Sequence, residues 1–200
     1  PWASRGRAGS AHGRLLMKDG VTPSWSGRSR ARALRHRGGA RLVVIDVDGC
    51  LTDGGLYVDQ EGKKPFKRFG PDDHAAIQAW HRSFSIVIVT SDIQEISRLR
   101  AEHMNVPFLT CGASLNDRMD GVHEAAKRYS RGFTSISDIV YIGDGYHDGD
   151  VMKGVGFGIA PADAWPGTLR AADAVTSRPG GHRAVAQALD YVGLKLRMGL

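Results

Sequence analysis

The sequence predicts an α/β domain of three layers, in which helices cover both faces of a parallel sheet. Short runs rich in β-branched residues alternate with helical patterns over residues 41–200, and this alternation is typical of parallel sheets. The runs are apolar throughout, as strands buried on both faces should be. A chain of 200 residues with 42% hydrophobic residues is long enough and apolar enough for one such domain.

The first strand is expected in Arg41–Val47, a run that is continuously apolar up to an acidic residue. Further strands are expected at 84–90, 106–110, 138–142, 155–159 and 173–176. Helical patterns lie between them at roughly 72–82, 93–104, 116–130, 148–153 and 182–198. Residues 55–69 are the exception, because two short extended stretches flank a polar turn there. We expect a β-hairpin that protrudes between the first strand and the first helix.

Residues 1–40 differ from the rest of the chain in charge. They hold eight Arg and one Lys against one acid, which is +8, whereas the remaining 18 basic and 20 acidic residues give −2. A segment rich in Arg, Ser, Gly and Ala without apolar periodicity predicts a disordered basic extension. An organelle transit peptide, sequence upstream of a start at Met17 and a nucleic-acid-binding arm are the alternatives.

The composition also excludes several classes of protein. Two cysteines in the whole chain exclude a disulfide-stapled secreted scaffold. No apolar run approaches the roughly 18 residues that a membrane span needs. We expect a cytoplasmic protein without a membrane partner, and, because the folded part carries a net charge of −2, no nucleic-acid partner for that part.

Carboxylates gather where the expected strands end. Asp46 and Asp48 end the first strand, Asp92 follows the second core strand, and Asp144 and Asp148 follow the strand near residue 142. The carboxyl ends of parallel strands are where ligands bind in open α/β sheets. Converging carboxylates repel one another and need a cation, and an all-oxygen ligand set suits Mg²⁺. A carboxylate in such a site can also attack phosphorus and form an aspartyl-phosphate.

Two of these segments together resemble the catalytic motifs of the haloacid dehalogenase superfamily. They are Asp46-Val-Asp-Gly49 and Gly143-Asp-Gly-Tyr-His-Asp148. The chain most resembles a branch that includes the 3-deoxy-manno-octulosonate 8-phosphate phosphatases and the phosphatase-like domain of acylneuraminate cytidylyltransferases. Phe69-Gly-Pro-Asp-Asp73, Val155-Gly-Phe-Gly-Ile-Ala-Pro-Ala162 and Gly180-Gly-His-Arg-Ala-Val185 add to this resemblance. It covers about residues 41–198 and implies a Rossmann-like sheet with a protruding hairpin and no cap domain.

The resemblance implies roles for particular residues. Asp46 would be the nucleophile and Asp48 the general acid/base. Mg²⁺ would be held by Asp46, the Asp48 carbonyl and Asp144, with Asp148 behind them, and Thr90 would donate a hydrogen bond to phosphate. The implied substrate is a small sugar-acid phosphate of the octulosonate or nonulosonate type, as used in lipopolysaccharide or sialic acid biosynthesis.

The sequence departs from the family pattern at three places, of which one is Gly145, where the family usually has the second acid of Gly-Asp-Asp. Members commonly have Thr-Gly-Arg where this chain has Thr90-Ser-Asp92, which replaces a cation by an anion. The phosphate-binding Lys of the family is absent, and Arg118 at a predicted helix start is its candidate replacement. A solvated surface Arg is the alternative interpretation of Arg118. We further expect Asp73, Ser91 and Arg183 to approach the substrate.

Two classes of function stay open. One is a Mg²⁺-dependent phosphomonoesterase, and the other is a catalytically silent oligomerisation module of the cytidylyltransferase type. The motif carboxylates of Asp46, Asp48 and Asp144 are all present, which favours the enzyme. The resemblance also implies a homotetramer. Hairpin 55–69 carries apolar side chains on a ribbon that would be marginal alone, so we expect it to pair with neighbouring subunits.

Overall fold

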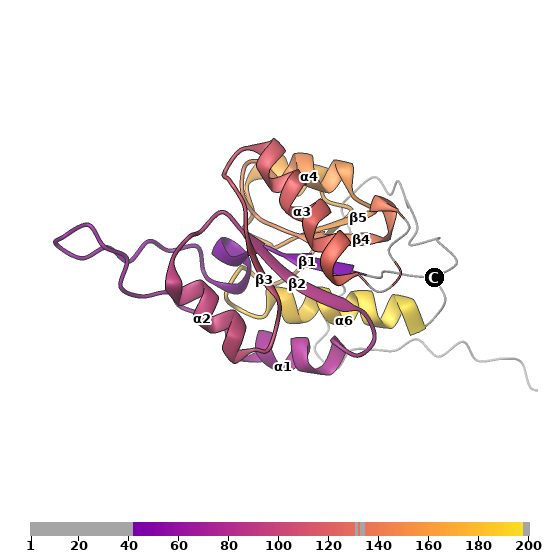
Figure 1. Cartoon of the computed structure of the whole chain (residues 1–200), viewed down its shortest axis with the longest axis horizontal. Coiled ribbons are helices and arrows are strands. Elements are labelled where there is room, and N and C mark those ends of the chain that lie inside the picture. The colour runs from indigo at the N-terminus through magenta and orange to yellow at the C-terminus, as the bar shows by residue number, and fades with distance from the viewer. Residues whose placement is uncertain (1–41, 131, 133–134, 198–200) are drawn as a thin grey trace, which may run out of the picture.

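The computed structural model describes residues 42–130, 132 and 135–197, so the extension expected at 1–40 lies outside the described residues. The described chain contains a six-stranded parallel sheet of order β3-β2-β1-β4-β5-β6, which confirms the predicted fold class (Figure 1). The strands are β1 (Leu42–Ile45), β2 (Ser85–Thr90), β3 (Phe108–Thr110), β4 (Ile139–Ile142), β5 (Phe157–Ala160) and β6 (Ala174–Val175).

Helices cover both faces of this sheet. They are α1 (Pro71–Trp80), α2 (Glu95–His103), α3 (Leu115–Tyr129), α4 (Asp148–Gly154), α5 (Pro166–Ala171) and α6 (Ala184–Arg197). Figure 1 shows α1, α2 and α6 on one side of the sheet and α3 and α4 on the other. The sequence did not predict α5, because its first two residues are Pro166 and Gly167, a pair that is typical of turns and loops. Among the described residues, no helix has the length and apolarity to cross a membrane.

The central strand β1 is buried on both faces, which explains why its sequence is apolar without interruption. All four residues of β1 are buried. Val43 belongs to the core cluster that contains Ile77 of α1, whereas Val44 belongs to the cluster that contains Val122 of α3. Successive side chains of a strand point to opposite faces, and here each face is covered by helices.

The direction in which the chain adds strands changes at β1. From β1 the chain goes to β2 on one side, and it later returns to β4 on the other side. The loops that leave β1 and β4 therefore separate at the same edge, which is where ligands bind in such sheets. The two strands stay in register up to that point, because the backbone N–H of Asp46 donates to the carbonyl of Ile142 at 3.0 Å.

Residues 55–69, called the ribbon below, leave the sheet as the long indigo-to-purple loop in Figure 1. Its two arms run antiparallel, as expected for a hairpin, with Tyr57 opposite Phe66 and a turn closed by the N–H of Asp59 and the carbonyl of Lys63. The arms meet at the isolated Tyr57–Phe66 bridge, with a second bridge between Thr52 and Phe69 at the base, and they do not form the regular strands expected of a hairpin. Pro65 removes one backbone donor, and an unsupported two-stranded ribbon is only marginally stable.

Candidate active site

The loop after β1 is a tight turn that glycine makes possible. Gly49 has a φ of 72°, and a Cβ there would lie 2.0 Å from Oδ2 of Asp144. The loop is supported from behind by a second glycine-rich segment, because the N–H of Gly181 donates to the carbonyl of Cys50 at 2.9 Å. A Cβ on Gly180 would lie 1.9 Å from the Gly49 carbonyl oxygen. The two glycine-containing motifs therefore let three loops approach one another closely.

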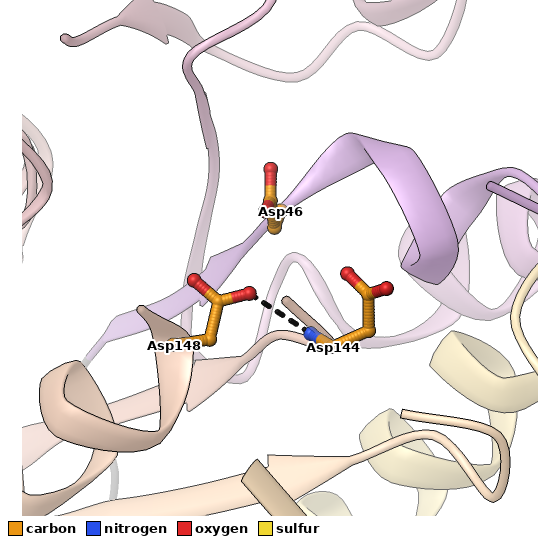
Figure 2. Close-up of side chains that lie close together, drawn as sticks. All are labelled: Asp46, Asp144 and Asp148. Carbon is orange, nitrogen blue, oxygen red and sulfur yellow. Dashed lines mark hydrogen bonds between the residues drawn. The ribbon is translucent and has the colours of Figure 1, made fainter. Parts of the chain in front are cut away.

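Three carboxylates meet at this edge of the sheet. One oxygen each from Asp46, Asp144 and Asp148 lies within 4.8 Å of the others (Figure 2). Asp148 is fixed at the start of α4, where it accepts hydrogen bonds from the N–H groups of Asp144 at 2.9 Å and Gly145 at 2.7 Å. The hydroxyl of Tyr141 donates to its other oxygen at 2.8 Å. Asp148 thereby fixes the loop that presents the Asp144 carboxylate.

Arg118 supplies the cation of this cluster. Its Nη1 lies 3.0 Å from Oδ2 of Asp46 and 3.0 Å from Oδ1 of Asp148, and its Nη2 donates to the hydroxyl of Ser91 at 3.3 Å. Only 14% of the side chain is exposed, so Arg118 is not a solvated surface residue. Its place is set by the start of α3, where Ser114 caps the helix. Burial disfavours the charged guanidinium, but the two carboxylates outweigh it and raise the Arg118 pKa.

Crowding changes the acidity of the carboxyl groups. Burial and the neighbouring Asp148 raise the pKa of Asp46 to about 7, although Arg118 acts against the shift. Burial, Asp46 and Asp148 raise the pKa of Asp144 to about 7. The cluster holds three carboxylates and one guanidinium, which pairs with Asp46 and Asp148, so it lacks positive charge when all three are ionised. Oxygen donors with this excess of negative charge fit a hard divalent cation such as Mg²⁺.

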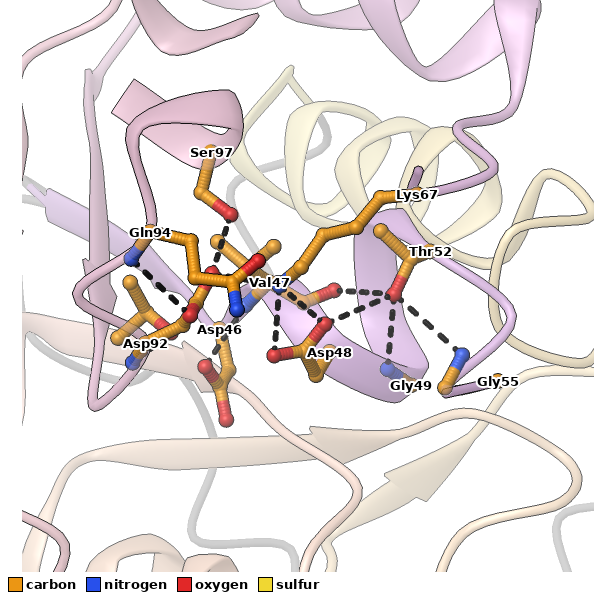
Figure 3. Close-up of polar contacts among 12 residues, drawn as sticks. Asp46, Val47, Asp48, Gly49, Thr52, Gly55, Lys67, Asp92, Gln94 and Ser97 are labelled. Atoms are coloured by element: carbon orange, nitrogen blue, oxygen red, sulfur yellow. Dashed lines mark hydrogen bonds and ion pairs between the residues drawn. The ribbon is translucent and has the colours of Figure 1, made fainter. Parts of the chain in front are cut away.

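A second cluster of opposite charges lies beside the first, and Figure 3 shows it. Lys67 comes from the ribbon, and its Nζ lies 2.7 and 2.9 Å from the two oxygens of Asp48 and 2.6 Å from Oδ2 of Asp92. Its side chain is only 7% exposed. The sequence analysis missed Lys67, because a ribbon residue follows no period that could place it. One feature of the sequence could have indicated such a residue. Asp92 stands where the family commonly has Arg, and a carboxylate near other carboxylates needs a cation beside it.

The remaining predicted residues divide into two groups. Thr90 is buried at the end of β2, where its hydroxyl accepts the N–H of Asp92 at 3.1 Å, and Ser91 contacts the first cluster. Asp73 is buried at the junction of α1 and α6 and accepts the N–H of Ala186 at 2.8 Å. The exposed Arg183 pairs with Asp72.

Asp73 and Arg183 thus stand apart from the catalytic edge in their contacts. In the described part of the chain, no hydrogen bond or ion pair joins either residue to the acidic cluster. Their contacts instead hold α6 against α1. Their predicted approach to substrate stays a prediction.

The fold is that of haloacid dehalogenase hydrolases. A hydrolase of this superfamily from Legionella pneumophila superposes with a TM-score of 0.70 at 24% identity, over 80% of this chain and 85% of that one. No family model matches the sequence.

Sequence relatives define the family more closely. The 3-deoxy-D-manno-octulosonate 8-phosphate phosphatase of Yersinia pestis is 31% identical over 76% of this chain and 79% of its own length. A crystal structure of the enzyme of that name from Yersinia pestis has a TM-score of 0.71 at 30% identity, over 80% of this chain and 84% of that one. The chain belongs to the family of 3-deoxy-D-manno-octulosonate 8-phosphate phosphatases and is a phosphatase.

The structure of a further similar enzyme contains bound ligands. The enzyme of the same name from Moraxella catarrhalis, solved with a magnesium ion, a phosphate ion and a KDO molecule, has a TM-score of 0.69 at 25% identity. It matches over 78% of this chain and 86% of its own. The relatives are named as phosphatases, and nothing in them supports the alternative of a silent oligomerisation module.

Proposed function

We propose that the protein is a Mg²⁺-dependent phosphomonoesterase that works through an aspartyl-phosphate on a small sugar-acid phosphate. The observation that carries this proposal is the cluster of Asp46, Asp144 and Asp148 at the edge of β1 and β4, with Arg118 paired to Asp46 and Asp148. It unites a nucleophilic carboxylate, oxygen donors for a metal and a cation for phosphate in one site.

The residues present fit a magnesium ion. The carboxylates of Asp46 and Asp144 and the carbonyl of Asp48 would hold it. Asp48 lies in the short helical turn Val47–Leu51, and its ψ of 130° turns its carbonyl away from the direction of the other carbonyls of that turn. Burial, and after it repulsion between the neighbouring carboxylates, raises the pKa values of Asp46 and Asp144, and a bound cation would relieve that repulsion. Magnesium, when bound, neutralises these carboxylates and the charge on the transferring phosphoryl group.

Asp46 is held ready to attack phosphorus. Its Oδ1 accepts the N–H of Val47 at 2.7 Å and its Oδ2 contacts Arg118. In the first step a bond forms between an Asp46 oxygen and phosphorus while the bond from phosphorus to the ester oxygen breaks. Arg118 and the Thr90 hydroxyl stabilise the phosphoryl oxygens, and Asp48 gives a proton to the departing alkoxide.

The second step releases phosphate and restores the enzyme. Water attacks phosphorus, the bond between phosphorus and the Asp46 oxygen breaks, and Asp48 takes the proton that the water loses. The half-exposed side chain of Asp48 suits both steps, because the leaving alcohol and the attacking water must reach it from solvent. Inorganic phosphate and the sugar acid are the products.

The substrate class is supported by the names of the relatives, which act on 3-deoxy-D-manno-octulosonate 8-phosphate. The test is release of phosphate from octulosonate and nonulosonate phosphates and from a chromogenic phosphate, each with Mg²⁺ and with EDTA. We expect turnover with Mg²⁺, abolition by EDTA and a preference for one sugar-acid phosphate. Turnover unaffected by EDTA would contradict the metal, and no turnover of any phosphate would contradict the proposed function.

The ribbon supports a tetramer. Leu56 is 70% exposed and Phe66 is 69% exposed, and Tyr57 and Val58 between them are also exposed. Apolar side chains on an isolated ribbon suit pairing with copies of this chain. Replacing residues 56–68 by a short Gly linker should convert tetramers to monomers in sedimentation. A wild-type protein that sediments as a monomer with full activity would contradict this assembly.

A further inference from the structure

The geometry points to Lys67 as the residue that positions the carboxylate of Asp48, with Asp92 as the anchor of Lys67. This inference deepens the proposed function and rests on it, because it concerns the residue proposed to move protons. Lys67 comes from the ribbon, and none of the motifs that define the site includes it.

Asp92 is a rigid anchor. Its Oδ2 accepts from Nζ of Lys67 and from the hydroxyl of Ser97, both at 2.6 Å, and its Oδ1 accepts the N–H of Gln94 at 3.1 Å. Its own N–H donates to the Thr90 hydroxyl, and only 10% of its side chain is exposed. Burial acts to raise the pKa of Asp92, but the bonds from Lys67 and Ser97 outweigh it and lower that pKa. Asp92 is therefore an ionised group fixed at the start of α2.

Asp48 has no comparable support of its own. Its side chain is 49% exposed, and its further hydrogen bond is a long one of 3.3 Å from the Thr52 hydroxyl. The two shortest contacts of its carboxylate, at 2.7 and 2.9 Å, are both with Nζ of Lys67. A half-exposed aspartate without these contacts would sample several rotamers. Lys67 therefore sets the direction in which Asp48 points.

The ammonium group is fully used in this arrangement. A lysine has three N–H donors and no acceptor, and Nζ has three carboxylate oxygens within 2.9 Å. No donor is left for an anion on the substrate. Lys67 is thus a positioning residue, and binding of a substrate carboxylate is the alternative that the test must exclude.

The arrangement also explains the departure from the Thr-Gly-Arg pattern. Asp92 stands where the family commonly has a cation, and in this chain the cation reaches the same place from the ribbon. The position of the ribbon and the direction of Asp48 are therefore coupled through one side chain.

The first experiment compares Lys67→Met with Lys63→Met in the full chain, using a chromogenic phosphate with saturating Mg²⁺. Lys63 lies on the same ribbon with its side chain 75% exposed, so it is a matched control. We expect Lys67→Met to lower kcat about tenfold or more, since general acid–base catalysis contributes about 10²- to 10⁴-fold. KM should change less than about twofold. Lys63→Met should leave both unchanged, and Lys67→Arg should recover part of kcat.

The second experiment tests whether Lys67 acts through Asp48. In a protein that carries Asp48→Asn, adding Lys67→Met should cause no further loss, because the group that it positions is already removed. Asp92→Asn should lower kcat in the same direction as Lys67→Met and by less. Melting temperatures of all variants separate this effect from loss of fold.

Three results would overturn the inference. A higher KM with unchanged kcat in Lys67→Met would make Lys67 a substrate-binding residue. Additive losses in the double variant would show that Lys67 acts independently of Asp48. Equal rates for wild type and Lys67→Met would assign the ion pairs to stability alone. An inactive wild type is a different result, which overturns the proposed function and this inference together.

Discussion

Two charged clusters lie side by side at the active edge of the sheet, and they differ in charge balance. The first holds the carboxylates of Asp46, Asp144 and Asp148 and one cation, Arg118, which pairs with Asp46 and Asp148. In the second, two carboxylates share the ammonium group of Lys67. With all carboxylates ionised, the first cluster lacks two positive charges and the second lacks one. The first cluster is the one that needs a further cation.

The difference also separates chemistry from positioning. Burial and mutual repulsion raise the pKa of both Asp46 and Asp144 to about 7, and perturbed groups of this kind gather at functional sites. The pKa of Asp92 in the second cluster is instead lowered, because hydrogen bonds outweigh burial there. We infer that the first cluster supplies the nucleophile and the metal site, and that in the second cluster Lys67 and Asp92 hold the general acid/base Asp48 in place.

The largest expected effect is that of Asp46→Asn. An amide cannot form the aspartyl-phosphate, so turnover should fall to background while the fold is kept. Phosphate release and the circular dichroism spectrum measure the two properties separately. Substantial remaining activity would show that the first cluster works without a covalent intermediate.

Next in size is the effect of Arg118→Ala. The first cluster would lose its cation and the phosphate would lose a bidentate donor, so kcat should fall at least about a hundredfold. Arg118→Lys should recover part of this loss, since Lys keeps the charge without the planar fork. Both are measured with saturating Mg²⁺. A neutral Arg118→Ala variant in an active phosphatase would assign phosphate binding to a cation of a neighbouring subunit.

Most of the fold and part of the site followed from the sequence. The uninterrupted apolar run of β1 predicts a strand covered on both faces. In the structure β1 is fully buried and lies inside the sheet, between β2 and β4. The acids that follow β1 and β4 had to meet because parallel strands end at one edge, and Asp46, Asp144 and Asp148 do so. The strand and the meeting of the acids could be predicted because they depend on apolar runs and on the residues that directly follow them, which can be read from the sequence.

The partners of Lys67 and Asp73 could not be predicted, because they depend on contacts between segments that are distant in the sequence. Lys67 reaches Asp92 from an irregular ribbon, and nothing in its neighbours sets the direction of its side chain. Asp73 stands in a motif, yet its carboxylate accepts an N–H at the start of α6, 113 positions along the chain. Such partners are set by the packing of whole elements. Local sequence patterns therefore cannot predict them.

A smaller effect is expected for Asp144→Asn. The variant keeps the nucleophile and loses one metal ligand, so the Mg²⁺ concentration for half-maximal activity should rise about tenfold or more. Activity at saturating Mg²⁺ should be largely restored. Titration of activity with Mg²⁺ in both proteins measures this shift. An unchanged requirement would remove Asp144 from the proposed metal site, and the contrast between the clusters would lose its main support.

The smallest expected effect is a pH-dependent stabilisation by Mg²⁺. In the metal-free protein the carboxyl groups of Asp46 and Asp144 have a pKa of about 7, against 3.8 for an ordinary aspartate. The folded state therefore binds protons that the unfolded state has released, and these groups favour folding most at pH values below about 4. That contribution is lost as the pH rises through about 7. Mg²⁺ needs the ionised carboxylates, so its stabilising effect should grow over the same range.

Melting temperatures with EDTA and with Mg²⁺, at pH values of about 5.5, 7 and 8.5, measure this dependence. We expect the rise caused by Mg²⁺ to be small at the lowest pH and to reach a few degrees at the highest. Asp144→Asn is the control, because it removes one of the two titrating groups and should flatten the difference. Other carboxylates titrate in both proteins and cancel in the comparison. The Lys67→Met variant should keep the full pH dependence, since Lys67 belongs to the other cluster. A Mg²⁺ effect of the same size at every pH would mean that the ion binds away from Asp46 and Asp144.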